Sequence, residues 1–269
     1  MADGENPPMI RVQNLVKRFG EVAAVDGVSF DVQAGEIFAF LGPNGAGKTT
    51  TIQMLTTLLR PTEGSITLDG LDPVSKPLDV RRRFGIVFQD PSLDSELTAA
   101  ENMDLHGVLY HVPRRIRVER AETLLKLFEL WDRRNSRVKE FSGGMRRRLE
   151  IARGLLHTPK ILFLDEPTLG LDPQSRNLLW THIKHLNETE GVTVFLTTHY
   201  MDEAERVARR IAIIDHGRIV AQGTPGELKQ QTGSESLEQA FLALTGSTIR
   251  DEQADGSDQM RRMAKMWRR

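Results

Sequence analysis

A run of glycines followed by a lysine and two threonines carries the most evident chemistry in the sequence. The segment reads Gly42-Pro-Asn44-Gly45-Ala-Gly47-Lys48-Thr49-Thr50. Glycines let the backbone curl so that several N–H groups converge on phosphate oxygens, and a following helix adds partial positive charge at its N-terminus. Lys48 would reach the β- and γ-phosphates, Thr49 would coordinate Mg²⁺, and Thr50 would contact the α-phosphate side. The pattern predicts a nucleoside triphosphate site.

The elements on either side separate a true phosphate loop from a simple glycine-rich turn. An apolar run at residues 37–41 precedes the loop and predicts a buried strand, while residues 50–59 are predicted to form a helix. Because strand, loop and helix follow in this order, we set aside the glycine-rich turn as an explanation.

A pair of carboxylates follows a second apolar strand at residues 161–164. Ligands in open α/β sheets bind at the carboxyl ends of the strands, so Asp165 is placed to hold Mg²⁺ through water. Glu166 is then the predicted general base, which orients the water that attacks the γ-phosphate. Alone, such a glutamate could merely cap a helix; the phosphate loop upstream favours the catalytic role.

A second candidate anion site is Phe141-Ser142-Gly143-Gly144-Met145, which precedes a basic helix expected over residues 146–155. A serine and two glycines at a helix start offer hydroxyl and backbone donors. The segment resembles the signature of ABC transporter ATPases, which usually reads Leu-Ser-Gly-Gly-Gln. In that family the signature binds the γ-phosphate of ATP held by the other subunit. The resemblance therefore implies a head-to-tail dimer with two ATP molecules in its interface. Phe141 and Met145 depart from the usual motif but leave these donors intact, so we expect the site to remain competent.

Four further residues match family motifs in the expected order. Gln89 matches the loop glutamine that touches Mg²⁺ and the attacking water, and Asp172 matches the loop that crosses the dimer interface. His199 matches the switch histidine that contacts the γ-phosphate, and Phe19 stands where the family stacks an aromatic ring on adenine. Each alone would suggest only a surface or core residue; their shared order supports the resemblance.

The resemblance runs from about residue 10 to residue 223. The signature segment, residues 171–176 and the helix expected near residues 236–246 are similar to the ATPases of ABC-2-type exporters, and to daunorubicin-resistance-type drug efflux ATPases in particular. This implies peripheral attachment to the cytoplasmic face of the cell membrane, with integral membrane permease subunits and a second ATPase chain, identical or different, as partners. The cargo would be drugs or other lipophilic compounds. The alternative is a soluble non-transport ATPase, such as one that assists iron–sulfur assembly.

Short apolar runs separated by helical stretches predict an α/β fold with a mainly parallel sheet, and this pattern resumes at residue 160 and continues to residue 219. The resemblance implies that the sheet belongs to a RecA-like core. Short alternating segments at residues 10–14 and 65–69 predict an antiparallel layer beside it, and helical spacing without strand runs predicts an inserted helical subdomain at about residues 90–153. We expect an ABC ATP-binding domain over residues 1–246. Residues 247–269 form a charged tail, expected to be disordered or to contact lipid head groups.

Composition excludes several classes of protein. The formal net charge is −1, from 36 basic and 37 acidic residues, so no basic excess points to nucleic acid. The absence of cysteine excludes disulfides and thiolate metal sites. The N-terminus has no signal-peptide pattern, and no apolar run approaches the ~18 residues of a membrane helix. We therefore expect any membrane role to depend on a partner.

Overall fold

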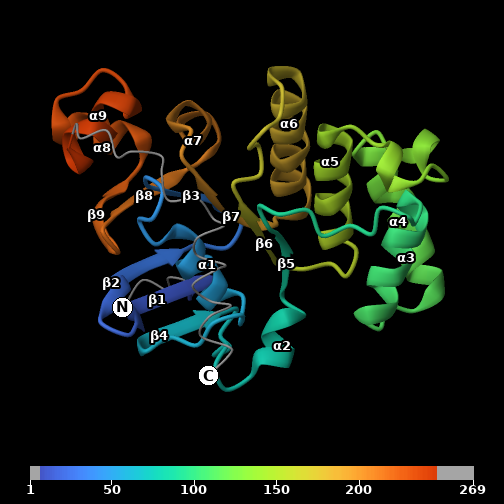
Figure 1. Ribbon diagram of the computed structural model, residues 1–269, viewed down its shortest axis with the longest axis horizontal. Coiled ribbons are helices and arrows are strands. Elements are labelled where there is room, and N and C mark those ends of the chain that lie inside the picture. The colour runs from blue at the N-terminus through green and yellow to red at the C-terminus, as the bar shows by residue number, and fades with distance from the viewer. Residues whose placement is uncertain (1–6, 247–269) are drawn as a thin grey trace, which may run out of the picture.

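The computed structural model describes residues 7–246, which form two sheets with helices around them (Figure 1). The expected tail at residues 247–269 lies outside the described residues. The larger sheet has six strands in the order β5 (Phe84–Val87), β6 (Ile161–Asp165), β7 (Thr193–Thr198), β3 (Ile37–Leu41), β8 (Arg210–Asp215) and β9 (Arg218–Gly223). All neighbouring strands are parallel except β8 and β9.

Successive side chains along the strands of the larger sheet point alternately into two separate hydrophobic cores. In β3, Phe38 and Phe40 face one core, whereas Ile37, Ala39 and Leu41 face the other. Every residue of β3 is buried, which explains why it reads as a continuous apolar run in the sequence. The sheet is therefore covered on both faces.

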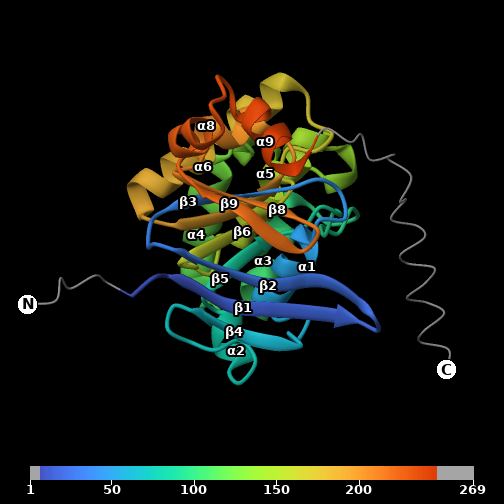
Figure 2. The ribbon, with the colours of Figure 1, turned by 90° about the vertical axis from the view of Figure 1, so that its left-hand side faces the viewer.

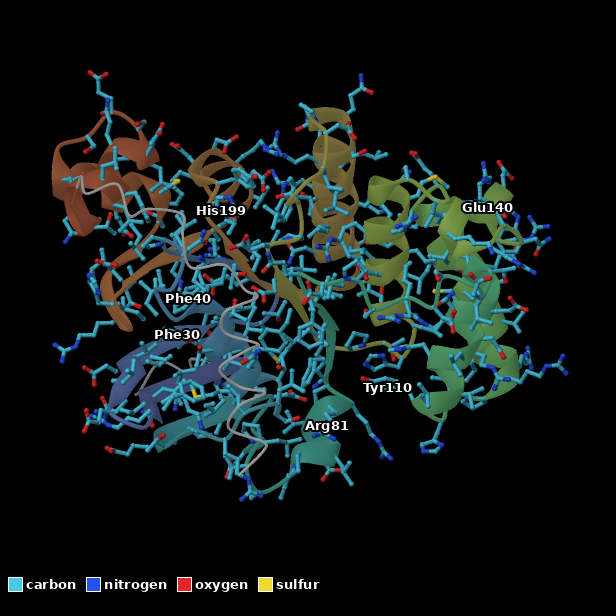
Figure 3. All side chains as sticks on the ribbon, viewed as in Figure 1. Phe30, Phe40, Arg81, Tyr110, Glu140 and His199 are labelled. Carbon is cyan, nitrogen blue, oxygen red and sulfur yellow. The ribbon has the colours of Figure 1, made fainter. Side chains whose placement is uncertain are left out.

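One face of the larger sheet packs against the smaller antiparallel sheet, which has the order β2 (Val22–Val32), β1 (Ile10–Phe19) and β4 (Glu63–Leu68). Phe30 of β2 joins the two layers, since its ring centroid lies 5.5 Å from that of Phe40 and 5.7 Å from that of Phe195 (Figure 3). Seen from the side, β1, β2 and β4 form a layer below the larger sheet (Figure 2). The expected antiparallel layer is confirmed.

Most helices lie on the other face of the larger sheet or at the ends of the molecule (Figure 1), but the helices that carry Ile52 and Val80 pack into the core of the smaller sheet. The helices are α1 (Lys48–Leu55), α2 (Pro77–Arg81), α3 (Ala99–Leu109), α4 (Arg114–Leu127), α5 (Gly143–Gly154), α6 (Pro173–Glu190), α7 (Met201–Val207), α8 (Pro225–Thr232) and α9 (Leu237–Thr245), with single 3₁₀ turns η1 (Trp131–Arg133) and η2 (Val138–Glu140). Among the described residues, the chain between β5 and β6 contains helices and turns but no strand. We retain residues 90–153 as the proposed helical subdomain.

Three local expectations needed correction. The helix after the phosphate loop spans Lys48–Leu55 rather than residues 50–59, because Thr57 has a left-handed φ of 67° and the Leu58 and Leu59 N–H groups both turn back to Gln53 O. The basic helix α5 begins earlier, at Gly143. The pattern of parallel strands expected up to residue 219 ends at β8, because β9 turns back and pairs with β8 in the antiparallel direction.

The C-terminal part of the described chain follows its sequence pattern. Thr224 caps α8 through a reciprocal bond with Glu227, and α9 buries Leu237, Ala240 and Phe241 against the core. Within residues 7–246, no helix has both the length and the apolar character needed to span a bilayer.

Two half-buried histidines make the stability of this fold sensitive to acid. The His106 and His157 rings flank Tyr110, with centroids 4.6 and 3.9 Å from the tyrosine ring. Burial lowers the pKa of His106 from 6.5 to about 3 and that of His157 to about 4. Below pH 6.5 the two histidines therefore bind protons in the unfolded chain but stay neutral in the folded chain. The free energy of unfolding should decrease as the pH falls from 6.5 towards 4.

Urea unfolding at several pH values measures this decrease. His106→Phe removes one proton-binding group and should flatten the decrease, while His111→Asn, at an exposed histidine nearby, should leave it unchanged. An equally steep decrease in both variants would contradict the explanation.

Candidate active site

The phosphate loop between β3 and α1 can be built only with glycines at particular positions. Gly45 and Gly47 have left-handed φ values of 76° and 108°. A Cβ atom on Gly47 would lie 2.5 Å from Ala24 O, and one on Gly42 would lie 2.5 Å from Ile214 O. Side chains at Gly42 and Gly47 would therefore push the loop away from the sheet, and the backbone could no longer curl around an anion.

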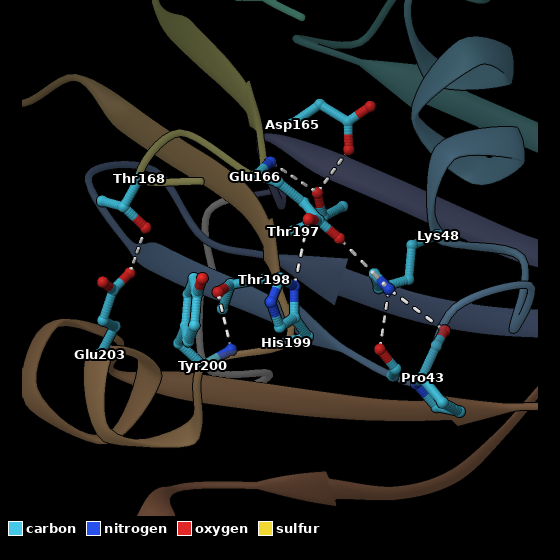
Figure 4. A network of polar contacts seen from close by, with 11 residues as sticks. Pro43, Lys48, Asp165, Glu166, Thr168, Thr197, Thr198, His199, Tyr200 and Glu203 are labelled. Atoms are coloured by element: carbon cyan, nitrogen blue, oxygen red, sulfur yellow. Dashed lines mark hydrogen bonds and ion pairs between the residues drawn. The ribbon is translucent and has the colours of Figure 1, made fainter. Parts of the chain in front are cut away.

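Lys48, the first residue of α1, points into the curl of this loop. Its side chain is 5% exposed, and its Nζ donates to Gly42 O at 2.7 Å and Pro43 O at 3.2 Å (Figure 4). Nζ also lies 3.5 Å from Glu166 Oε1. Burial lowers the pKa of Lys48, while Glu166 and Asp165 act against that shift. The Lys48 ammonium group is thus surrounded by carbonyl and carboxylate oxygens, and the oxygens of a bound phosphate could replace them.

Asp165 lies at the carboxyl end of β6 and is 2% exposed. Thr197, on the adjacent strand β7, donates from Oγ1 to Asp165 Oδ1 at 2.5 Å. Burial raises the pKa of Asp165, although hydrogen bonds from Thr197 and Thr49 oppose the rise. Carboxylate, hydroxyl and amide oxygens are the ligands that Mg²⁺ prefers, so Asp165, Thr49 and Gln89 form a donor set that fits this ion.

Glu166 has an unusual backbone conformation for a residue with a side chain. Its φ is 46°, and its N–H donates to both the carbonyl O and the Oγ1 of Thr197, each at 3.1 Å. Such a conformation costs about 1–3 kcal/mol and persists only where neighbours enforce it. Its Oε2 lies 3.1 Å from His199 Nδ1 (Figure 4). Burial favours the neutral acid, but His199 and Lys48 outweigh it and lower the pKa of Glu166. The carboxylate is therefore charged and can accept a proton.

Lys48, Glu166 and His199 line one cavity of about 380 Å³, whereas Asp165 and Gly42 lie outside its lining. It is lined by Ala24, Asn44, Gly45, Gly47, Lys48, Thr49, Thr50, Gln89, Glu166, Leu169 and His199. The fold thus brings together predicted residues from four separate motifs. Ala24 and Leu169 were missed, because an apolar lining residue carries no chemical signal in a sequence. Thr197 was missed as well, although it stands two residues before His199.

Other predicted residues lie elsewhere. Phe19, at the end of β1, is 38% exposed and does not line the cavity; Lys17 Nζ lies 5.2 Å from its ring centroid. Its role at adenine stays a prediction. None of Ser142, Gly143 and Gly144 lines the cavity around Lys48.

The signature segment instead lies beside the loop that contains Asp172. Ser142 caps α5 by accepting a hydrogen bond from Met145 N–H at 3.2 Å. Asp172 caps α6 by accepting from Ser175 N–H at 2.9 Å and Ser175 Oγ at 2.7 Å. A Cβ atom on Gly144 would lie 2.6 Å from Ser175 Oγ. The two helix N-termini are therefore in close contact and share one edge of the molecule.

This contact predicts that alanine at the two signature glycines has different effects on the free energy of unfolding. Gly144→Ala places its Cβ atom 2.6 Å from Ser175 Oγ and 2.9 Å from Ser175 Cβ, so α5 and α6 must separate. We expect a loss of about 1–3 kcal/mol in the free energy of unfolding, as for other overpacked sites. Gly143→Ala is the matched control, since its Cβ meets only Leu171 Cδ2 at 4.0 Å. Urea unfolding measures both; equal effects would contradict the packing argument.

A mainly parallel sheet with a phosphate loop, a Mg²⁺-compatible donor set and a charged glutamate defines a phosphate-loop nucleoside triphosphatase. A family model described as "ABC transporter" matches residues 25–169 of the 269-residue chain. The chain belongs to this family, as an ATP-hydrolysing ATP-binding subunit.

Individual relatives agree with this assignment. The chain is 50% identical to the daunorubicin/doxorubicin resistance ATP-binding protein DrrA of Streptomyces peucetius, over 85% of this chain and 69% of that protein. It is 41% identical to Nod factor export ATP-binding protein I of Burkholderia lata, over 90% of this chain and 79% of that protein. A dimeric ATP-binding cassette in a post-hydrolysis state, bound to ADP and Pi, superposes with a TM-score of 0.72 at 31% identity, covering 80% of this chain and 98% of that one.

Proposed function

We propose that this ATPase powers an ABC-2-type exporter of drugs or other lipophilic compounds. Two copies, or this chain and a related one, would form a head-to-tail dimer on the cytoplasmic face of the cell membrane, coupled to separate integral membrane permease subunits. The proposal for export rests on the relatives named for daunorubicin resistance and Nod factor export. Neither name supports the alternative, a soluble ATPase of iron–sulfur assembly.

The hydrolytic role is carried by one observation, the placement of Glu166 between Lys48 and His199 at 3.5 and 3.1 Å. Glu166 would accept a proton from the attacking water as the water oxygen bonds to the γ-phosphorus. The bond from the γ-phosphorus to the β–γ bridging oxygen breaks in line, which yields ADP and inorganic phosphate. Lys48 and His199 would stabilise the negative charge that spreads over the phosphoryl oxygens.

The remaining predicted residues would bind and orient the nucleotide. The backbone N–H groups from Asn44 to Thr50 would hold its phosphates, and Thr49, Gln89 and Asp165 would hold Mg²⁺. When bound, that ion neutralises charge on the β- and γ-phosphates. The hydrogen bond from Thr197 fixes the orientation of the Asp165 carboxylate, as outer partners of metal ligands commonly do.

The dimer would supply what one chain lacks at its own cavity. Ser142, Gly143 and Gly144 form anion-binding donors at the start of α5, but they do not line the cavity of their own chain. A second chain would bring its signature to the γ-phosphate, and Asp172, beside the signature, would lie in the same interface. The solved structure bound to ADP and Pi is dimeric, which supports the formation of a dimer.

Co-purification from native membranes in detergent tests the partner. A tagged chain should retain an integral membrane protein, whereas recovery with soluble scaffold proteins alone would contradict the proposal. Export is tested with inside-out vesicles that contain both subunits. ATP should drive uptake of doxorubicin, the compound in a relative's name, and vesicles with the Glu166→Gln subunit are the control. Equal uptake in both would contradict an ATP-driven exporter for this compound.

A further inference from the structure

A buried glutamate outside the cavity connects the segments that carry the proposed catalytic groups. Glu203, on α7, is 1% exposed. Its Oε2 accepts a hydrogen bond of 2.6 Å from Thr168 Oγ1, and its Oε1 lies 3.0 Å from Arg176 Nε. Figure 4 shows Glu203 facing Thr168, with Tyr200 beside them. A carboxylate removed from water is costly unless it is paired and hydrogen-bonded. The buried Glu203 carboxylate therefore depends on its contacts with Thr168 and Arg176.

Thr168 belongs to the turn that joins Glu166 to Asp172. It is fully buried, and its carbonyl oxygen accepts the Leu171 N–H at 3.1 Å. One residue on, the Leu169 N–H donates to Glu166 O at 3.2 Å. Fixing the Thr168 side chain therefore fixes the turn on both sides, including the strained backbone of Glu166.

Arg176 connects the same carboxylate to two other segments. Its N–H donates to Asp172 O at 3.0 Å within the first turn of α6. Its guanidinium carbon lies 4.5 Å from the centroid of the Tyr200 ring, and that ring lies 4.2 Å from the His199 ring. The guanidinium thus joins the Asp172 segment to the strand end that carries His199.

Charge and burial distinguish Glu203 from its neighbour Glu205. Burial raises the pKa of Glu203, and the Thr168 hydrogen bond and Arg176 act against the rise. Glu205, two residues further along α7, is 34% exposed and pairs with Lys229 of α8. Glu205 instead joins α7 to α8, which makes it a matched control.

We propose that Glu203 is a positioning residue for ATP hydrolysis, which holds the segments of Glu166, Asp172 and His199 in one fixed arrangement. This inference rests on the roles proposed above for those three residues. Glu203 does not touch the nucleotide; it acts through Thr168 and Arg176. Its removal should therefore lower the rate of the chemical step and leave the binding of ATP to the phosphate loop unchanged.

The test compares purified full-length Glu203→Gln with Glu205→Gln. Glutamine keeps the size of the side chain but removes the charge that pairs with Arg176. We expect kcat for Glu203→Gln to fall by about 10- to 100-fold, as for other residues that orient catalytic groups. KM for ATP and the number of ATP molecules bound per chain should match those of Glu205→Gln. Thr168→Val removes only the hydroxyl contact and should give an intermediate loss, which keeps the test valid if Glu203→Gln folds poorly.

Two results would overturn the inference. One is a kcat for both Glu203→Gln and Thr168→Val within about twofold of Glu205→Gln. The other is a fall in bound ATP per chain in parallel with kcat, which would mean that Glu203 serves folding alone. Failure of the proposed active site is a separate outcome, since Glu166→Gln would then hydrolyse ATP normally.

Discussion

Glu166→Gln is expected to lower ATP turnover by about 10²- to 10⁴-fold, the range typical of a general base. The amide cannot accept the proton of the attacking water, but it has nearly the same shape. Lys48 keeps its contacts with Gly42 O and Pro43 O, so ATP should still bind. Phosphate release measures turnover, and equilibrium dialysis measures binding.

The same variant should accumulate a closed dimer, because ATP binds but is not consumed. Size-exclusion chromatography should show this dimer with ATP and Mg²⁺ but not with ADP. Glu205→Gln serves as the control for loss of a carboxylate and should hydrolyse ATP at the wild-type rate. Near-wild-type hydrolysis by Glu166→Gln would show that another group is the base.

Lys48→Ala should weaken both ATP binding and turnover, in contrast to Glu166→Gln. The buried Lys48 ammonium group lies 3.5 Å from Glu166 Oε1, and among the described residues no other lysine or arginine lines the cavity. Removing one preorganised donor commonly lowers kcat by about 10²–10³-fold. We therefore expect at least that loss in kcat/KM, measured by steady-state hydrolysis.

Lys126→Ala is the control for Lys48→Ala. Lys126 forms an exposed pair with Glu122 on α4, and pairs of this kind contribute little to stability. It should leave kcat/KM unchanged. If Lys48→Ala retained wild-type affinity for ATP, the cavity around the phosphate loop could not be the nucleotide site.

Local patterns made much of the fold and site predictable. The loop from Gly42 to Thr50 carries its chemistry within nine consecutive residues, and the buried strands are continuous apolar runs. A carboxylate at the end of such a strand must reach the ligand edge of the sheet, so Asp165 could be placed without coordinates.

Other features depend on contacts between residues far apart in the chain. Thr197 becomes important because β7 lies beside β6, and Glu203 because α7 brings it against Thr168 and Arg176. The direction of β9 depends on its turn rather than on its hydrophobicity. Strand periodicity carries none of this information. The sequence pattern likewise could not show that the close approach of Ser175 leaves no room for a side chain on Gly144.

The central claim is that one chain completes the ATP site of another. Mixing two inactive variants tests it directly. Glu166→Gln has an intact signature but no base. Gly143→Asp has an intact base, and its Cβ would meet only Leu171 Cδ2 at 4.0 Å, so the fold should tolerate a carboxylate that repels the γ-phosphate. A head-to-tail dimer of the two variants contains one fully intact site.

The measurement is the ATPase rate of the equimolar mixture after the subunits have exchanged. Half of the dimers should be mixed, with one of two sites active in each, so the mixture should recover about a quarter of the wild-type rate per chain. A rate that stays at the average of the two separate variants would contradict the account, because it would mean that each chain completes its own site.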